Sequence, residues 1–459
     1  MDFASSAFRT PSVVSPGAYY LIAEVDPNNT IAESSETNNV ANQFISTDGI
    51  DVVFDWNATL LNAIQAVASR PETSPPFGVR NQAIVHAAIY DAVNAIDRSH
   101  KPYLVNIDAS DPLIAGASAE AAAVEAAYQT LVNLYPTEKA AFDEQRTRSL
   151  AEIPDGTAEN KGVALGKFVA DRILALRSTD GAIRADKVPY TPGSDPGDYQ
   201  LIPGQTPLLP GWRRVTPFAI DSVSEFRPDG PPEFGSPQYG REIEEVRLLG
   251  ALENTDVTTI TRTEDQTEIA KFWAYDREDT FRPPGQWNEI AQEVALDQGN
   301  TLAENARLFA LLNIAEADAG IVGWDAKYTF NQLRPITAIQ NADNDGNSIT
   351  TQDPDWESLL ATPPFPDYVS GHSVFGGAAA QILARFFDNN NDNIDNDISF
   401  SIPSQELPGV SRSFSSFTQA AQENADSRLY GGVHVDLATV DGVAIGKDVG
   451  NFVFDNFLV

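Results

Sequence analysis

Apolar residues recur at intervals of three and four positions over most of the chain after Trp56. This spacing places apolar side chains along one face of an α-helix. It predicts helices at residues 58–69, 79–97, 117–134, 137–152, 158–178, 238–252, 258–274, 286–298 and 300–328. A further apolar run at 374–387 predicts a helix that opens near His372. We therefore expect a mainly all-α fold.

Residues 1–48 follow a different pattern and form a separate N-terminal segment. The stretches 18–25 and 40–45 are rich in β-branched and aromatic residues, and the turn-forming residues 26–29 follow the first of them. Two strands are too few to close a sandwich, so we expect a small β-rich appendage ahead of a helical domain at 49–459. With residues 31–39 between the strands, this segment resembles the C-terminal half of a CARDB-type immunoglobulin-like adhesion module.

A long interval at residues 188–237 separates two helical halves of the chain. It is rich in proline and glycine and lacks a helical pattern. Loops of this length usually serve function or cover a cleft. We expect a structured excursion.

Composition narrows the classes of partner and of chemistry. The chain has 459 residues, of which 42% are hydrophobic, so it is long enough to bury a large core. Its net charge of -35 disfavours nucleic acid or an anionic membrane surface as a partner. The absence of cysteine excludes disulfides, zinc–thiolate sites and a cysteine nucleophile. No apolar run approaches the roughly 20 residues of a membrane span.

Two Asp/Asn-rich segments, 341–347 and 388–397, have the composition of calcium-binding loops. Neither has a glutamate at the twelfth loop position, where an EF-hand needs one: Gln352 and Ser399 stand there. We expect solvated turns rather than calcium sites.

Three short motifs in the C-terminal half together describe a site for an oxyanion. They are Lys327-x6-Arg334-Pro335, Ser370-Gly371-His372 and Ser427-Arg428-x5-His434. Each guanidinium can donate two parallel hydrogen bonds to an oxyanion, whereas a lysine supplies a mobile point charge. A glycine at a helix start lets the backbone N–H come close to an anion. The three motifs in this order therefore predict one binding site, although each is weak alone.

The chain has four histidines, and we expect them to have different roles. In an oxyanion site, one imidazole attacks or coordinates the central atom and the other transfers a proton. His372 and His434 lie in the motifs and are the candidates. His86 lies in an apolar helical stretch and is expected in the core, while His100 lies in a polar stretch and is expected at the surface.

The motifs and their order resemble those of the vanadium-dependent haloperoxidases, which share their site with acid phosphatases of the phosphatidic acid phosphatase type 2 superfamily. The resemblance covers about residues 50–459 and includes segments 53–58, 83–96, 272–276 and 431–434 of the bacterial secreted branch. It implies helical bundles of that type, vanadate as the cofactor, and hydrogen peroxide and halide as substrates. It also implies a secreted or extracellular protein, although residues 1–10 lack the basic and apolar regions of a signal peptide.

The resemblance also implies a role for each residue of the site, within residues 271–440. His434 would be the axial vanadium ligand, and the equatorial oxygens would be held by Lys327, Arg334, Ser370, Gly371 and Arg428. His372 would be the acid–base residue, and Lys327 would polarise bound peroxide. Asp276 resembles the carboxylate that orients the acid–base histidine, and such a partner would raise the pKa of His372 and fix its tautomer.

Two aromatic residues bear on which halide is used. Trp324 and Phe365 match the apolar pair of the chloroperoxidases, whereas algal bromoperoxidases carry histidine in place of the phenylalanine. A dry aromatic wall removes water from a hydrated halide. We expect oxidation of bromide to hypohalous acid, with chloride as a second candidate and the organic acceptor left open.

Two other functions remain open from the sequence. An acid phosphatase of the same superfamily would use His434 as the phosphorylated nucleophile and His372 as the general acid. A surface-adhesion protein with an inert helical domain ranks last, because all seven residues of the motifs are present. A helical member of the haloperoxidase family with apolar outer faces is expected to pair as a homodimer.

Overall fold

The computed structural model describes residues 18–24, 40–46, 51–67, 74–387 and 398–459. The predicted turn at 26–29, the connection at 31–39, the acidic segment 388–397 and the N-terminal residues 1–17 lie outside the described residues. The fold is mainly α-helical, as predicted. No described helix combines the length and the apolar character needed to cross a bilayer.

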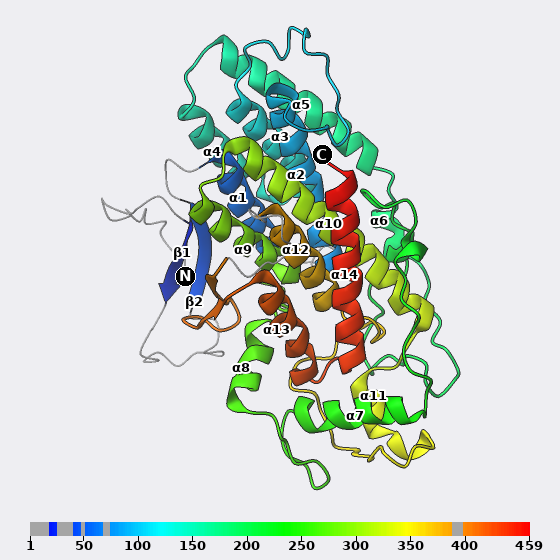
Figure 1. Cartoon of the computed structure of the whole chain (residues 1–459). Helices are drawn as coiled ribbons and strands as arrows, with labels where there is room; N and C mark the ends of the chain where they lie inside the picture. The colour runs from blue at the N-terminus through cyan, green and yellow to red at the C-terminus, as the bar shows by residue number, and fades with distance from the viewer. Residues whose placement is uncertain (1–17, 25–39, 47–50, 68–73, 388–397) are drawn as a thin grey trace.

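The helices follow the chain in the order seen in Figure 1. They are α1 Val52–Ala66, α2 Pro75–Asp97, α3 Ala119–Leu134, α4 Lys139–Ala151, α5 Thr157–Arg177, α6 Ala182–Ala185, α7 Pro237–Gly250, α8 Glu264–Phe272, α9 Arg282–Gln298, α10 Leu302–Phe330, α11 Pro335–Gln340, α12 Gly371–Phe386, α13 Phe417–Tyr430 and α14 Asp436–Asn456. Single turns of 3-10 helix lie at Pro136–Glu138, Trp212–Arg214, Val223–Glu225 and Ala342–Asn344.

Helix α10 is the central element of the molecule. It is 29 residues long and buried on nearly all sides. On one side it packs against α2 of the N-terminal half, and on another against α12 and α14 of the C-terminal half. A capping box formed by Thr301 and Glu304 starts the helix, and Asn331 in the left-handed conformation (φ 51°) ends it. Lys327 therefore lies in a last turn whose end is well defined.

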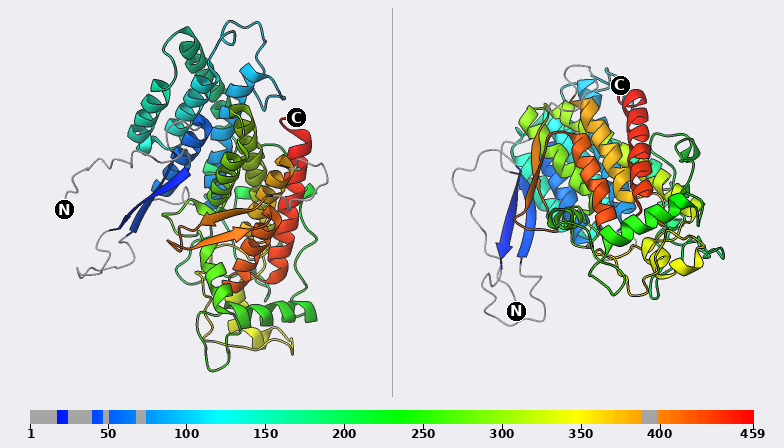
Figure 2. Two further views of the ribbon diagram at one scale, coloured as in Figure 1. Left: turned by 60° about the vertical axis from the view of Figure 1, so that its left-hand side comes forward. Right: turned by 60° about the horizontal axis from the view of Figure 1, so that its bottom comes forward.

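Strands are few and short among the described residues. At the side of the bundle, β1 (Ala18–Glu24) pairs antiparallel with β2 (Val40–Ser46), with Tyr20 opposite Phe44 (Figures 1 and 2). Both strands agree with the prediction to within one residue. A second hairpin, β3 (Phe400–Pro403) with β4 (Ser411–Phe414), was not predicted.

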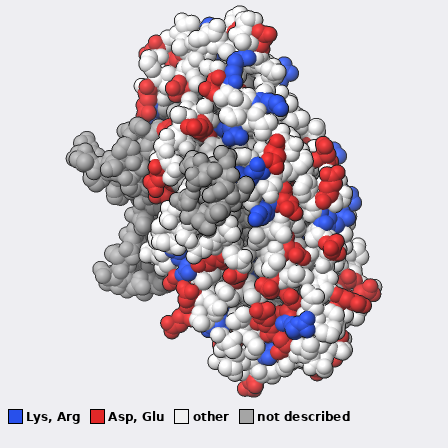
Figure 3. All heavy atoms as spheres, viewed as in Figure 1, with Lys and Arg blue, Asp and Glu red and all other residues white. Residues whose placement is uncertain are grey.

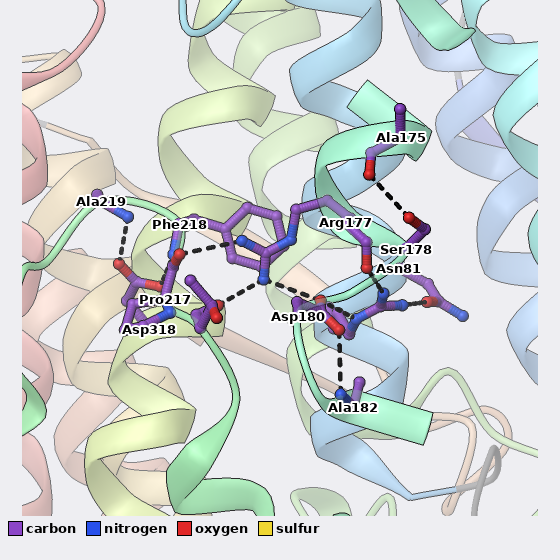
Figure 4. A network of polar contacts seen from close by, with 12 residues as sticks. Asn81, Ala175, Arg177, Ser178, Asp180, Ala182, Pro217, Phe218, Ala219 and Asp318 are labelled. Atoms are coloured by element: carbon purple, nitrogen blue, oxygen red, sulfur yellow. Dashed lines mark hydrogen bonds and ion pairs between the residues drawn. The ribbon is translucent and has the colours of Figure 1, made fainter. Parts of the chain in front are cut away.

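The proline-rich excursion is fastened to α10 and α5 by a buried polar network (Figure 4). The Asp318 carboxylate of α10 accepts hydrogen bonds from three successive backbone N–H groups, those of Phe218, Ala219 and Ile220, at 2.6–2.9 Å. Arg177 of α5 donates to the carbonyls of Thr216 and Pro217 at 2.6 and 3.0 Å. The prediction of a structured segment is confirmed.

Two glycine-rich helices, α12 and α14, pack more closely than side chains would allow. A Cβ on Gly446 would come within 2.2 Å of the Val374 carbonyl oxygen, and one on Gly377 within 2.4 Å of the Val443 carbonyl oxygen. The glycines thus let the two backbones approach, and this contact sets the start of α12 against the loop that precedes α14. Neither α13 nor α14 was predicted. Both helices are rich in small and polar residues, so large apolar residues do not recur at a clear helical spacing.

Helix α8 is shorter than the predicted segment 258–274. It starts at Glu264, because Thr263 and Gln266 form a capping box there. Thr258 instead donates a hydrogen bond of 2.5 Å to Asp353, outside any helix. After α8, residues 273–281 leave the helical path and carry Asp276 toward the C-terminal bundle.

Candidate functional site

The structure brings the three predicted motifs together at one end of the C-terminal bundle. Lys327 lies in the last turn of α10, and Arg334 is the residue before α11. Ser370 caps the start of α12, where Gly371 and His372 are the first two helical residues. Arg428 lies in the last turn of α13, and His434 lies in the short loop before α14. Their side chains are buried, with His372 the most exposed at 7%.

Arg334 is held rigidly, but one of its nitrogens has no acceptor. Its Nε donates to the carbonyl oxygen of Phe365 at 2.7 Å, and Nη1 donates to that of Val433 at 2.6 Å. Nη1 also lies 3.3 Å from Nε2 of His434. Nη2 is buried and has no hydrogen-bond partner among the described residues. An arginine with this arrangement has a donor in reserve for an anion.

Arg428 is less fully paired than Arg334. Its Nη2 donates to the Asp276 carboxylate at 2.7 Å. Within the part of the chain that the structure describes, its Nε and Nη1 are buried without partners. Leaving two donors of a buried cation unpaired is costly, so these nitrogens indicate a bound group that is absent from the protein itself.

Lys327 supplies the third cation of the site. Its Nζ donates to the carbonyl oxygens of Pro366 and Asp367, each at 3.0 Å, which uses two of its three N–H groups. The ammonium also lies 4.7 Å from the centre of the Phe365 ring. Burial and the neighbouring Arg334 lower the pKa of Lys327 well below its usual range, while Asp367 opposes the shift. An incoming anion would favour the charged lysine.

The start of α12 adds uncharged donors to the site. The Ser370 hydroxyl accepts a hydrogen bond from the Ser373 N–H at 3.4 Å and so retains its own hydrogen for donation. The first N–H groups of a helix have no carbonyl partner within it and lie at the positive end of its dipole. Gly371 and His372 contribute two of them. This agrees with the predicted helix opening near His372.

His372 does not have the carboxylate partner that the sequence predicted. Its Nε2 donates to the backbone carbonyl oxygen of Ala274 at 2.8 Å, whereas Asp276 pairs with Arg428. The carbonyl accepts only, so the neutral ring carries its proton on Nε2 and Nδ1 keeps a lone pair. Asp276 does favour the charged ring, as expected, but burial and Arg428 outweigh it and lower the pKa of His372 to about 4.

Asp367 is a residue of the site that the sequence analysis missed. Its side chain is fully buried, and Oδ1 lies 2.5 Å from Nδ1 of His434 and 3.6 Å from Nη1 of Arg334. Burial raises the pKa of Asp367 to about 7, against the opposing effects of Arg334 and Lys327. Burial and the three cations hold the pKa of His434 well below its usual range. A carboxylate three residues before the Ser-Gly-His motif was the available signal.

An aromatic pair forms one wall of the site. The rings of Trp324 and Phe365 lie 5.3 Å apart at 51°. A cavity of about 490 Å³ reaches the same place from outside and is lined by Asp276, Phe365, Leu208 and Pro364, among others. The site is therefore buried but adjoins a cavity on the side of Asp276 and Phe365.

The remaining two histidines lie apart from the site, as predicted. His86 is fully buried in α2, 3.2 Å from the amide oxygen of Asn57, and its ring stacks on Phe309. His100 is only partly buried and lies 2.8 Å from the Ser99 hydroxyl.

The charge at the site contrasts with that of the surface. Acidic residues are spread over the face seen in Figure 3, with basic residues between them. Inside the site, three cations (Lys327, Arg334 and Arg428) face two carboxylates (Asp276 and Asp367). This surplus of positive charge, the unpaired guanidinium nitrogens and the helix start fit a tetrahedral oxyanion such as vanadate or phosphate.

Comparisons with known proteins agree with this geometry. Residues 307–458 match the family described as the VCPO second helical-bundle domain, and residues 4–43 match CARDB. The vanadium chloroperoxidase of Curvularia inaequalis is 27% identical over 477 residues, covering 83% of this chain and 77% of the relative.

Solved structures extend the similarity to the whole fold. A bacterial vanadium-dependent iodoperoxidase is 29% identical, with a TM-score of 0.72 over 88% of this chain and 96% of that one. A bacterial vanadium-dependent chloroperoxidase shares the fold at 18% identity, with a TM-score of 0.65 over 84% of this chain and 94% of that one.

Proposed function

We propose that this chain is a vanadium-dependent haloperoxidase like the proteins it resembles, and that it uses vanadate and hydrogen peroxide to oxidise bromide, with chloride as a second halide, to hypohalous acid. The main support for this proposal is that three buried guanidinium nitrogens of the site have no partner among the described residues. They are Nη2 of Arg334 and Nε and Nη1 of Arg428. In the overall reaction, halide loses two electrons to peroxide, one oxygen of which ends in hypohalous acid and the other in water.

The residues of the three motifs would hold the vanadate. His434 would be the ligand to vanadium, because its Nε2 lies beside Arg334 and faces a donor rather than an acceptor. The oxygens of vanadate would be held by Lys327, Arg334, Ser370, Gly371 and Arg428. Three cations would compensate the charge of the anion, and the fixed guanidinium forks would orient its oxygens.

When bound, vanadate supplies the Lewis-acid centre at which peroxide is activated toward halide. His372 would move the protons of the reaction. With a pKa lowered to about 4, its ring is neutral near pH 7, and the contact with Ala274 leaves Nδ1 as the proton acceptor. Lys327 would polarise peroxide at the site, since its ammonium has one N–H left over from its two carbonyl contacts.

Trp324 and Phe365 would form the halide environment. Their rings exclude water beside the Lys327 ammonium, which lies 4.7 Å from the Phe365 ring and 6.0 Å from that of Trp324. A halide that loses part of its hydration here would be attracted by the Lys327 ammonium, which two carbonyl oxygens hold in place. The dry wall and the fixed charge support a halide site next to the lysine. The iodoperoxidase among the relatives makes iodide a third halide for the test.

The test is a direct assay of reconstituted protein. Protein freed of vanadate is incubated with orthovanadate and assayed for bromination, chlorination and iodination of a cyclic diketone with peroxide, beside hydrolysis of p-nitrophenyl phosphate. We expect halide oxidation that requires vanadate. Phosphate hydrolysis without any halide oxidation would instead identify an acid phosphatase, since phosphate fits the same donors. His434→Ala is the negative control, and His100→Ala is its matched surface control.

A further inference from the structure

His434 is in contact with one carboxylate, and the contact is between two side chains that solvent does not reach. Its Nδ1 lies 2.5 Å from Oδ1 of Asp367, and the two side chains are 2% and 0% exposed. The other carboxylate oxygen, Oδ2, accepts the N–H of Val435 at 3.5 Å. Asp367 thus contacts both the ring of His434 and the backbone that follows it.

The backbone of Asp367 is itself held in place on both sides. Its N–H donates to the Gln332 carbonyl oxygen at 3.0 Å, and its carbonyl oxygen accepts from Lys327 Nζ at 3.0 Å. The His434 loop is anchored separately, because the N–H groups of Val433 and His434 both donate to the carbonyl oxygen of Arg428. The carboxylate and the ring therefore meet between two fixed segments of chain.

Two contacts on opposite sides of the ring define which nitrogen of His434 carries the proton. Nη1 of Arg334 can only donate, so Nε2, 3.3 Å away, must accept and carry a lone pair. A neutral imidazole then has its proton on Nδ1, the nitrogen that lies 2.5 Å from the Asp367 oxygen. The Arg334 contact is long at 3.3 Å, so the 2.5 Å approach of the Asp367 carboxylate, which favours the same tautomer when it is ionised, is the stronger constraint.

We propose that Asp367 is a positioning residue for His434, the residue that would bind vanadium, and holds its ring at Nδ1 so that the lone pair of Nε2 faces the oxyanion site. A carboxylate on the far nitrogen also raises the basicity of a ligating imidazole. This inference rests on the proposed function. It goes beyond the residues of the three motifs, none of which orients His434 through Nδ1.

Asp436 offers a matched control on the same loop. It is two residues after His434, but it starts α14 and is only partly buried. Its charge raises the pKa values of Glu242, Glu245 and Asp426, whereas it is not among the causes that shift the pKa of His434. Replacing either aspartate by asparagine removes one negative charge within a few residues of His434. Only the change at Asp367 alters the contact to the ring.

The experiment uses the full chain and two probes, orthovanadate and inorganic phosphate, in calorimetric titrations. In Asp367→Asn and Asp367→Ala we expect vanadate affinity to fall roughly 10- to 100-fold, the range seen for partners of ligating histidines. Inorganic phosphate stays tetrahedral and does not take the Nε2 lone pair as a fifth ligand, so its affinity should hold or increase when a buried negative charge leaves the site. Asp436→Asn should bind both probes within about twofold of the unmodified protein. The opposite responses of the two anions separate ring orientation from charge.

Ring ¹⁵N spectra of the vanadate-free protein give an independent readout, because the chain has only four histidines. We expect the His434 proton on Nδ1 in the unmodified protein and in Asp436→Asn, and a mixture of tautomers in Asp367→Ala. A proton on Nε2, or vanadate affinity unchanged in both Asp367 variants, overturns the proposal. Thermal unfolding checks that each variant folds, and the near-isosteric asparagine keeps the test decisive if alanine does not. If the unmodified protein binds no vanadate, the proposed function fails, and the spectra still report whether Asp367 sets the tautomer.

Discussion

Buried arginines occur in two regions of this molecule, with opposite surroundings. In the network between α2, α5 and the proline-rich excursion (Figure 4), Arg80 places all three of its guanidinium nitrogens on acceptors. Arg177 places both terminal nitrogens on acceptors and leaves only Nε without a partner among the described residues, and two carboxylates, Asp180 and Asp318, balance the charges of the two arginines. At the oxyanion site, by contrast, Arg428 uses one nitrogen of three on Asp276.

The difference shows what distinguishes a structural arginine from one that binds a ligand. Burial of the guanidinium does not, since the side chains are buried in both regions. The balance of charge and the number of unpaired donors do distinguish them. In the network, two arginines face two carboxylates and one guanidinium nitrogen lacks a partner among the described residues. At the site, three cations face two carboxylates and three guanidinium nitrogens lack partners there, which leaves donors for a ligand. The predictions below test that contrast, from the largest expected effect to the smallest.

Replacing the proposed vanadium ligand should have the largest effect. We expect His434→Ala to weaken vanadate binding by about 1,000-fold or more, equivalent to ~4 kcal/mol, because a direct ligand is lost rather than a partner of one. Calorimetric titration with orthovanadate measures it. His100→Ala, the same substitution at a partly exposed histidine, should bind normally. Vanadate binding within a few-fold of normal in His434→Ala would remove this residue from the proposed ligand set.

Removing an arginine from the paired network should affect stability alone. Arg177→Met leaves the Thr216 and Pro217 carbonyls without their donor, and we expect the free energy of unfolding to fall by about 3 kcal/mol. Chemical denaturation of the vanadate-free protein measures the loss. Vanadate affinity at a temperature where the variant is folded should be unchanged. A large loss of affinity would mean that the two regions are coupled, contrary to the comparison.

The same substitution at the oxyanion site should show the reverse pattern. In Arg428→Met we expect vanadate affinity to fall about 10- to 100-fold, the equivalent of one or two hydrogen bonds to a charged group. The free energy of unfolding without vanadate should change by less than ~1 kcal/mol, because an underpaired buried cation is removed and Asp276, 38% exposed, can be solvated. Equal losses of stability in the two methionine variants would contradict the contrast drawn between them.

The two regions also differ in what the sequence could predict. All seven residues of the three motifs come together in the structure. Each motif lies at or beside the end of a helix, so its residues keep their mutual positions without depending on distant contacts. Helix α10 was predicted to within about two residues, since the Thr301 capping box and a long apolar run leave little choice. The fastening of the excursion by Asp318 was not visible, because it depends on a contact between residues 98 to 100 positions apart.

The partners of the two site histidines were the hardest part of the site to predict. His372 bonds to a backbone carbonyl, that of Ala274, and a carbonyl has no signature in the sequence. Asp367 reaches His434 only because the start of α12 and the loop before α14 are drawn together by glycines such as Gly446, which also hide the apolar period of α14. The sequence analysis therefore missed the contacts that hold the two histidines, because these contacts depend on how the helices pack.

The smallest expected effect concerns the ionisation of His372. Burial and Arg428 lower its pKa to about 4, and the Asp276 carboxylate partly opposes this shift. Asp276→Asn should therefore lower the pKa of His372 further. The sign follows because the carboxylate favours the charged ring, and because its loss leaves Arg428 without its counter-charge. A bound oxyanion should act in the opposite sense and raise the pKa. Ring NMR titration of the vanadate-free protein, with and without inorganic phosphate, follows both shifts.

Asp279→Asn is the control, because Asp279 pairs with Arg277 instead of Arg428, and it should leave the pKa of His372 unchanged. Titration of His372 near its ordinary value of 6.5 would mean that the ring is not held in this surplus of positive charge.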